Sequence, residues 1–142
     1  MPSDWIVENC AGMFRVCNSL ESVDFIKDWD TSNVKDMSNM FNGCSSLTTL
    51  DLSNWNVSEV TRLSSFVNNC YQLNSFYAPK NINVSLSNFT ASTLLTSEHL
   101  MSIINNLNTI SSTQTLTIGA KNLVKLTSNE IKIATDKGWT IV

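Results

Sequence analysis

The fold prediction rests on residues 40–63, MFNGCSSLTTLDLSNWNVSEVTRL, which form the central copy of a sequence repeat. The upstream copy matches it at Met13, Phe14, Cys17, Leu20, Trp29, Val34 and Met37, and the downstream copy matches it at Phe66, Val67, Cys70, Leu73 and Phe76. The interval from Cys17 to Cys44 is one residue longer than the interval from Cys44 to Cys70. A period of roughly 20–50 residues is typical of proteins built by stacking one structural unit.

Within the central copy, the spacing of apolar residues changes along the chain. Residues 50–52, LDL, alternate apolar and polar side chains, which is the pattern of a strand. Apolar residues then recur three apart at Val57, Val60 and Leu63, which is typical of short helical or 3-10 turns. The pattern predicts that each copy is one coil whose apolar ladder is buried on the next coil.

The C-terminal part shows helix and strand patterns instead of the repeat. Residues 80–92 are polar, with alternating Ile82, Val84 and Leu86, and predict a loop or a short edge strand. We expect a helix that Thr96 or Ser97 caps. We expect a second helix that residues 127–130, TSNE, open as a capping box and that Gly138 ends. The apolar face of the first helix is Leu100, Ile103, Ile104 and Leu107. Residues 116–118 and 139–142 predict strands.

A resemblance to a known family adds to this pattern. The L-x-x-L-x-L spacing of Leu47, Leu50 and Leu52 is the leucine-rich-repeat signature, and residues 7–78 resemble the BspA-like repeats of bacterial surface proteins. The C-terminal sequence, from Leu116 onward, also looks like the tails that follow such repeats in gut-bacterial and prophage-encoded proteins. The expected fold class is α/β, a leucine-rich-repeat solenoid with parallel strands, about five coils and a helix-containing C-terminal cap.

The same pattern divides the chain into three parts of one continuous domain. Residues 1–12 are expected to be a truncated repeat or an N-terminal cap, and residues 13–79 the leucine-rich repeats. Residues 80–142 are expected to form helix-strand-helix-strand coils and a cap.

The four cysteines predict buried free thiols. Cys17, Cys44 and Cys70 occupy one position of the repeat, and Cys10 occupies the position of Met37 and Leu63. Zinc sites need close pairs such as C-x₂-C, and the sequence has none. We therefore expect neither disulfides, nor a metal site, nor a cofactor.

Composition and charge exclude several classes of partner. Charged residues are only 15% of the chain, the net charge is −3, and there is no basic stripe for nucleic acid to bind. No apolar run approaches the length of a membrane-spanning helix, roughly 18 residues or more, so we expect no membrane insertion. The N-terminal residues lack the pattern of a signal peptide.

No catalytic constellation is visible, and we expect the protein not to be an enzyme. The single histidine, His99, falls in the first turn of the expected helix without a positioned partner, and no glycine-rich phosphate loop is present. Asp28 and Asp30 form only a weak match to a calcium loop, and side-chain caps at a corner are the preferred interpretation. Three matches to the glycosylation pattern, at Asn56, Asn83 and Asn88, are expected from composition.

The best candidate surface is the outward face of the expected strands. If Leu50 and Leu52 point inward, the alternating side chains point outward. The outward columns are Ser22, Thr49, Ser75, Thr115 and Asp24, Asp51, Tyr77, Thr117. The predicted ligand-binding residues are Asp24, Thr49, Asp51, Ser53, Ser75, Tyr77 and Thr117, with Tyr77 as the anchor. Two alternatives stay open: Asp24 and Asp51 hydrogen-bond neighbouring coils, or the face only keeps the protein in solution.

The resemblance implies a non-catalytic protein-binding or adhesion module of a bacterial surface protein. Its partner would be a protein or a host surface molecule, and its location extracellular or at the cell surface. The alternative is a structural or receptor-binding component of a phage tail or similar particle, which the absent signal peptide and the tail resemblance favour. Such a component would be located in the phage virion, and an oligomer would then be possible.

Replacing Leu50 by Asp tests the predicted inward ladder. A carboxylate at a stacked core position is costly to bury, so Leu50→Asp should unfold the chain. The measurement is the melting temperature by circular dichroism; an unchanged value would show that Leu50 does not point inward.

Overall fold

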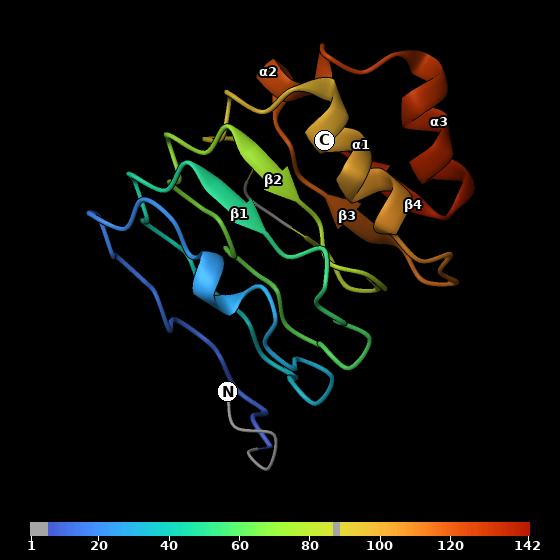
Figure 1. Ribbon diagram of the computed structural model, residues 1–142. Helices are drawn as coiled ribbons and strands as arrows, with labels where there is room; N and C mark the ends of the chain where they lie inside the picture. The colour runs from blue at the N-terminus through green and yellow to red at the C-terminus, as the bar shows by residue number, and fades with distance from the viewer. Residues whose placement is uncertain (1–5, 87–88) are drawn as a thin grey trace.

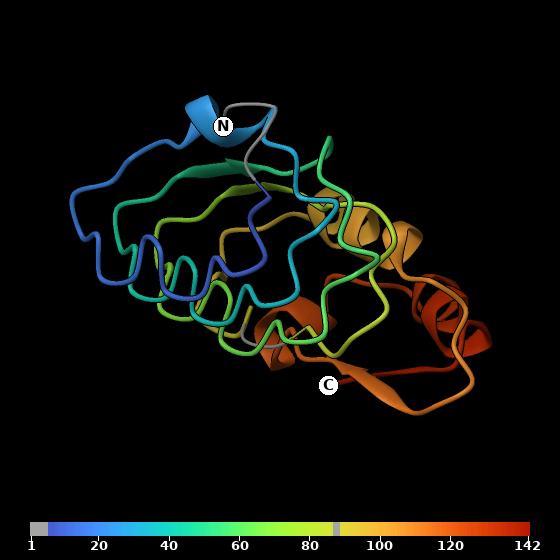
Figure 2. The same cartoon turned by 90° about the horizontal axis from the view of Figure 1, so that it is seen from below.

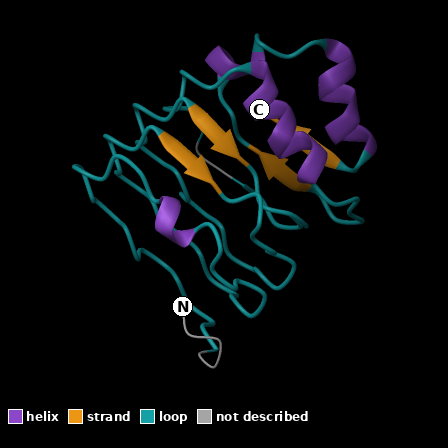
Figure 3. Ribbon diagram, in the orientation of Figure 1, coloured by secondary structure: helices purple, strands orange, loops and turns teal. Residues whose placement is uncertain are grey.

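The computed structural model describes residues 6–86 and 89–142. Its elements in chain order are η1 (Asp24–Ile26), β1 (Thr49–Asp51), β2 (Ser75–Tyr77), α1 (Ser97–Asn106), β3 (Gln114–Leu116), α2 (Ala120–Leu123), α3 (Ser128–Asp136) and β4 (Trp139–Ile141). The helices α1, α2 and α3 lie together at the C-terminal end, whereas most of the N-terminal half consists of turns and loops (Figures 1 and 3).

The strands form two small, separate parallel sheets. β1 pairs with β2, which sets Leu50 opposite Phe76, and β3 pairs with β4, which sets Thr115 opposite Thr140. Each sheet has two strands, and elsewhere the described residues form only isolated parallel bridges. The predicted leucine-rich-repeat solenoid of about five coils with parallel strands is therefore wrong.

On the N-terminal side, one extra residue prevents a third strand beside β1. The segment equivalent to β1 is residues 22–24, and the 3-10 helix η1 begins at its last residue and shifts which of the following side chains is buried. Ile26 takes the inward position, whereas Phe25, which the repeat pattern placed with the core, is 64% exposed. The longer spacing of the upstream copy is thus accommodated by a helical turn.

On the C-terminal side, helix α1 takes the place of a strand beside β2. The backbone N–H of Ala78 donates to Ser102 Oγ at 3.1 Å, and Asn106 Nδ2 donates to the carbonyl of Ala78 at 3.2 Å. Side chains of α1 thus take the hydrogen bonds that another strand would supply just after β2. Strand β3 instead forms an isolated parallel bridge, which joins its residue Leu116 to Leu86.

Successive copies of the repeat nevertheless lie side by side, joined by backbone hydrogen bonds between their turns (Figure 2). Phe14 N donates to Met40 O at 2.9 Å, and Phe41 N donates to Phe66 O at 2.9 Å. Each turn has two residues in the left-handed region, which reverse the chain twice over a short span. The first position holds Gly12, Asn39 and Ser65, and the second holds Val16, Gly43 and Asn69.

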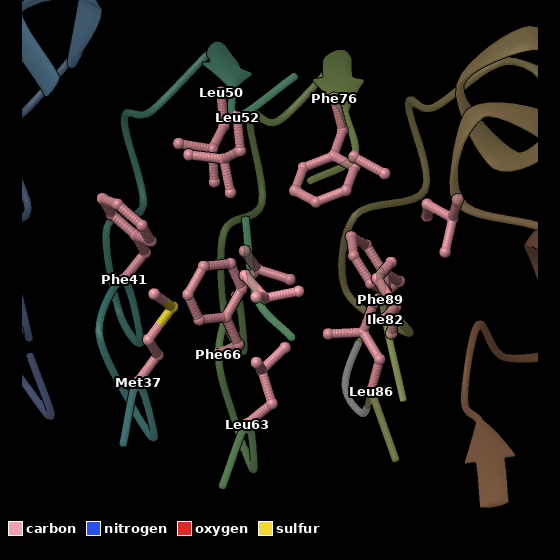
Figure 4. Packing of buried hydrophobic residues seen from close by; sticks show 14 of the residues in the cluster. Met37, Phe41, Leu50, Leu52, Leu63, Phe66, Phe76, Ile82, Leu86 and Phe89 are labelled. Carbon is pink, nitrogen blue, oxygen red and sulfur yellow. The ribbon is translucent and has the colours of Figure 1, made fainter. Parts of the chain in front are cut away.

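The buried side chains follow the same order, one layer per repeat. Figure 4 shows Met37 with Phe41, then Leu63 with Phe66, then Ile82 with Leu86 and Phe89, with Leu50, Leu52 and Phe76 projecting from β1 and β2 toward them. One apolar cluster contains these residues and extends from Cys10 to Trp139.

The tryptophans at the equivalent position of the upstream and central copies stack on each other. Trp29 and Trp55 stack with ring centroids 6.5 Å apart and planes at 6°. The buried Nε1 of Trp55 donates to the carbonyl of Ile26 at 2.9 Å, which satisfies the one polar group of the indole.

The cysteines are free thiols, as predicted, and their sulfur atoms link the repeats. Cys44 Sγ lies 3.0 Å from the carbonyl of Phe14, and Cys70 Sγ lies 3.2 Å from the carbonyl of Phe41. Burial raises the pKa of Cys44 to about 11 and that of Cys70 to about 12, and it also raises the pKa of Cys10. Cys17, in the upstream copy, is only half-buried, so the prediction that all four thiols are buried is wrong for this residue.

Both predicted helices are confirmed. α1 has Thr96 as its N-cap and buries Leu100, Ile103 and Ile104. α3 begins with the predicted capping box, in which Thr127 N donates to Glu130 Oε2 at 2.7 Å, and these contacts lower the pKa of Glu130. Gly138 ends it at a φ of 91°, where a Cβ would lie 2.7 Å from the carbonyl oxygen of Ile110.

A buried amide joins helix α2 to the segment that precedes α1. Asn122 is fully buried, and its Nδ2 lies within 3.3 Å of the carbonyls of Phe89, Ser92 and Ile118. Its Oδ1 accepts from Lys125 Nζ at 3.0 Å. The residues around 90 and 120 are thus held together by a satisfied polar group inside the fold.

Replacing Val16 by Asn should stabilise the protein. Val16 is β-branched and has a φ of 61°, a strained conformation that Asn tolerates and that Asn69 adopts at the equivalent position. The expected gain is about 1 kcal/mol, measured by urea denaturation. Val124→Asn is the matched control, because Val124 is exposed and has a φ of −66°. An equal or larger gain in the control would contradict strain relief.

Thiol reactivity tests the cysteine column. At pH 8 we expect a hydrophilic disulfide reagent to modify only Cys17 in the native protein and all four thiols in guanidinium. The raised native pKa values mean that the folded state holds these protons more tightly. The buried protonated thiols therefore contribute fully to the stability of the fold below about pH 8.5, and this contribution is lost as the pH rises further. In Cys17→Ser the native reaction should disappear; a fast reaction of a second thiol would contradict the burial.

Candidate functional site

The structure brings together four of the predicted ligand-binding residues on one face of β1 and β2. Thr49 lies beside Ser75, and Asp51 lies beside Tyr77, with Leu50 and Phe76 buried on the other side. Thr49, Asp51 and Ser75 are half-buried, and the side chain of Tyr77 is 41% exposed. Ser53 is exposed just beyond the end of β1.

The remaining two predicted residues do not belong to these strands. Asp24 is exposed at the start of η1, so it lies on a helical turn. Thr117 follows β3, which pairs with β4, and its backbone N–H donates to the carbonyl of Leu86 at 3.1 Å. The predicted outward columns extend over only two strands, because η1 and α1 limit the sheet to β1 and β2. Ser22 and Thr115 lie outside this sheet for the same reason.

The carboxylate of Asp51 is partly used by its own turn. Asp51 Oδ1 accepts from Ser53 N at 3.0 Å. Asp30 Oδ1 likewise accepts from Ser32 N at 3.0 Å and from Ser32 Oγ at 2.7 Å, and these bonds lower the pKa of Asp30. In both turns an Asp side chain accepts a hydrogen bond from the backbone two residues later. This agrees with the preferred interpretation of the weak calcium-loop pattern, which is a side-chain cap at a corner.

Helix α1 places an aromatic partner next to Tyr77. The rings of Tyr77 and His99 meet edge to face with centroids 5.5 Å apart. His99 Nδ1 lies 2.9 Å from Thr96 Oγ1, so the imidazole forms part of the helix N-terminal capping box. The contact fixes the Tyr77 ring at the border between the strands and α1.

The ion pair with the least exposed carboxylate joins two successive copies of the repeat. Asp36 is 8% exposed and forms an ion pair with Arg62, with Nε and Oδ2 2.9 Å apart. Desolvation raises the pKa of Asp36, but hydrogen bonds from Ser38 and the charge of Arg62 outweigh it, so the pKa lies below its ordinary value. This carboxylate is therefore charged and bound within the fold. No cluster of His, Cys, Asp and Glu that could hold a metal ion occurs within residues 6–86 and 89–142.

A second surface, which the sequence patterns did not predict, surrounds Tyr71. One hollow of about 610 Å³ crosses the turns of three repeats and is lined in part by Arg15, Asn18, Asn42 and Ser45. A second, of about 470 Å³, is lined in part by Thr90, Thr93 and Lys121. Tyr71 lines both. We call Arg15, Asn18, Asn42, Ser45, Tyr71 and Lys121 the Tyr71 surface.

A signal for this surface was present in the repeat. Tyr71 occupies the position that Asn18 and Ser45 hold in the other copies, so an aromatic side chain replaces small polar ones on a turn. The repeat is defined by the apolar positions that all copies share. Tyr71 does not lie at one of these positions, so the repeat pattern did not select it.

Comparison with protein families gives a match over most of the chain. The family model described as "Mycoplasma protein of unknown function, DUF285" matches residues 5–114, most of the chain. Neither curated proteins nor solved structures give a match. Within the described residues, no helix has the length and hydrophobicity needed to cross a bilayer.

Proposed function

Because the chain belongs to the family described as Mycoplasma protein of unknown function, DUF285, we propose its function from its own surface and repeat pattern. The proposed function is a non-catalytic protein-binding or adhesion module of a bacterial surface protein. It would bind a protein or a host surface molecule through the outward face of β1 and β2.

The observation that carries this proposal is the placement of Tyr77. Its side chain is 41% exposed, and the edge-to-face contact with His99 restricts the ring before any partner arrives. Tyrosine is among the residues that dominate protein interfaces, and a ring that is already ordered loses less entropy on binding.

The surroundings of Tyr77 also suit a protein interface. Thr49, Asp51 and Ser75 supply hydroxyl and carboxylate groups around the ring, so one aromatic anchor has a polar rim. The patch is small, which fits a weak contact repeated along a longer surface protein. The resemblance of the repeat to BspA-like proteins supports an extracellular or cell-surface location.

A second candidate is a structural or receptor-binding component of a phage tail or similar particle. The sequence from residue 116 to 142, which resembles the tails of prophage-encoded repeat proteins, favours it. Light scattering separates the two roles, because a defined trimer or higher assembly is expected of a particle component and a monomer of a binding module.

Binding measurements with paired tyrosine variants test the proposed face. We expect the chain to bind at least one member of a panel of immobilised extracellular-matrix and serum proteins in surface plasmon resonance. Tyr77→Ala should weaken that binding at least about tenfold, as for an interface anchor.

The matched control is Tyr71→Ala, which removes another exposed tyrosine on a different part of the surface and should leave this binding unchanged. Binding that survives Tyr77→Ala, or a panel without any binding, would contradict the proposed face. Circular dichroism checks that both variants keep the wild-type fold.

A further inference from the structure

The Tyr71 surface lies on the turns, and none of the residues that line its two open hollows belongs to β1 or β2. Its two hollows, of about 610 Å³ and 470 Å³, are within the range of small-molecule pockets. Both have Tyr71 as a wall, so a ligand that contacts this ring can extend to either side. From the first repeat to the residues around 120, the surface crosses several layers, on the order of 20 Å at strand spacing.

The charges of this surface are of one sign. Arg15 lines the first hollow and Lys121 the second, and no Asp or Glu lines either one. Neither cation forms a hydrogen bond or ion pair with another residue in the described part of the chain. In a protein of net charge −3, two unpaired cations without a neighbouring carboxylate in the lining favour an anionic ligand.

The aromatic wall is exposed and held in place. The side chain of Tyr71 is 56% exposed, and its hydroxyl donates to Asn69 Oδ1 at 3.0 Å. Asn69 is itself fixed by its left-handed turn position, with a φ of 60°. The ring is thus a pre-ordered apolar face in a polar setting, which suits the C–H face of a pyranose ring.

The floor of the first hollow offers side-chain polar groups. The turn N–H groups of Val16 and Gly43 already donate to the neighbouring repeats at 2.8 Å, so they are not free to pair with a peptide backbone. The side-chain amide of Asn18 has no hydrogen-bond partner among the described residues. Asn42 uses its Nδ2 on Asn39 at 2.9 Å, which leaves its Oδ1 to accept from a ligand hydroxyl.

We propose that the Tyr71 surface binds an acidic oligosaccharide. The Tyr71 ring stacks on a sugar ring, the Asn18 and Asn42 amides hydrogen-bond hydroxyls, and Arg15 and Lys121 pair with the carboxylates of flanking sugars. Arg15 can bind a carboxylate with two parallel hydrogen bonds, which adds geometric selectivity to charge attraction. A peptide strand is disfavoured at the first two turns, because the N–H groups of Val16 and Gly43 already donate to the neighbouring repeats.

Titration calorimetry of the full chain with a hyaluronan oligosaccharide tests the proposal, because this sugar carries alternating carboxylates. A chitin oligomer of equal length is the neutral control. We expect the acidic sugar to bind at least about tenfold more tightly than the neutral one, and the difference to shrink as salt is raised.

Variants assign the binding to this surface. Tyr71→Ala should weaken hyaluronan binding at least about tenfold, whereas Tyr77→Ala should leave it unchanged. Arg15→Gln should weaken it and reduce its salt dependence, whereas Lys27→Gln, at an exposed cation outside the two hollows, should have no effect. The fold is checked by circular dichroism, and Arg15→Gln keeps the test valid if Tyr71→Ala unfolds the chain.

Three results would overturn the proposal. These are no binding of hyaluronan, equal binding of the chitin oligomer, and binding of a poly-glutamate peptide that depends on Tyr71 as strongly as the sugar does. Failure here leaves the protein-binding face untouched, because that face is tested by Tyr77→Ala with protein partners. The paired tyrosine variants therefore distinguish failure of either idea from failure of both.

Discussion

The fold depends on how the chain satisfies its backbone polar groups with little regular secondary structure. In the N-terminal half, turns of successive repeats donate to each other, as Phe14 N does to Met40 O and Phe41 N to Phe66 O. A buried backbone group without a partner costs free energy, so a change in the interval between copies must be accommodated elsewhere in the coil, as η1 accommodates the extra residue of the upstream copy. The apolar layers shown in Figure 4 follow from that spacing.

Much of the local structure could be predicted from the sequence because it depends on nearby residues. The helix N-termini at Thr96 and Thr127 and the column of Cys44 and Cys70 follow from capping chemistry or from the repeat period. The extent of the sheet could not be predicted, since it depends on which element lies beside each strand. One extra residue produced η1, and the polar side chains of α1 replaced another strand.

The same distinction applies to the candidate sites. The pairing of Asp51 with Tyr77 was predictable, because the interval between the central and downstream copies fixes which of their residues lie opposite one another. Asp24 and Thr117 were misplaced because the pattern was extended beyond the two strands that pair. The Tyr71 surface was missed because Tyr71 differs from the residues at the equivalent position of the other copies. The positions that all copies share indicate which side chains pack in the core, and they say less about which side chains bind a ligand.

The cysteine column has a consequence for where the protein can fold. All four cysteines lie in the described part of the chain and all are free, and the sulfur atoms of Cys44 and Cys70 contact backbone carbonyls of the preceding repeat. The structure therefore needs no oxidant to form and loses no covalent link when a reductant is present. The same chain can reach this fold in a reducing compartment and keep it in an oxidising one, with its buried thiols shielded from both.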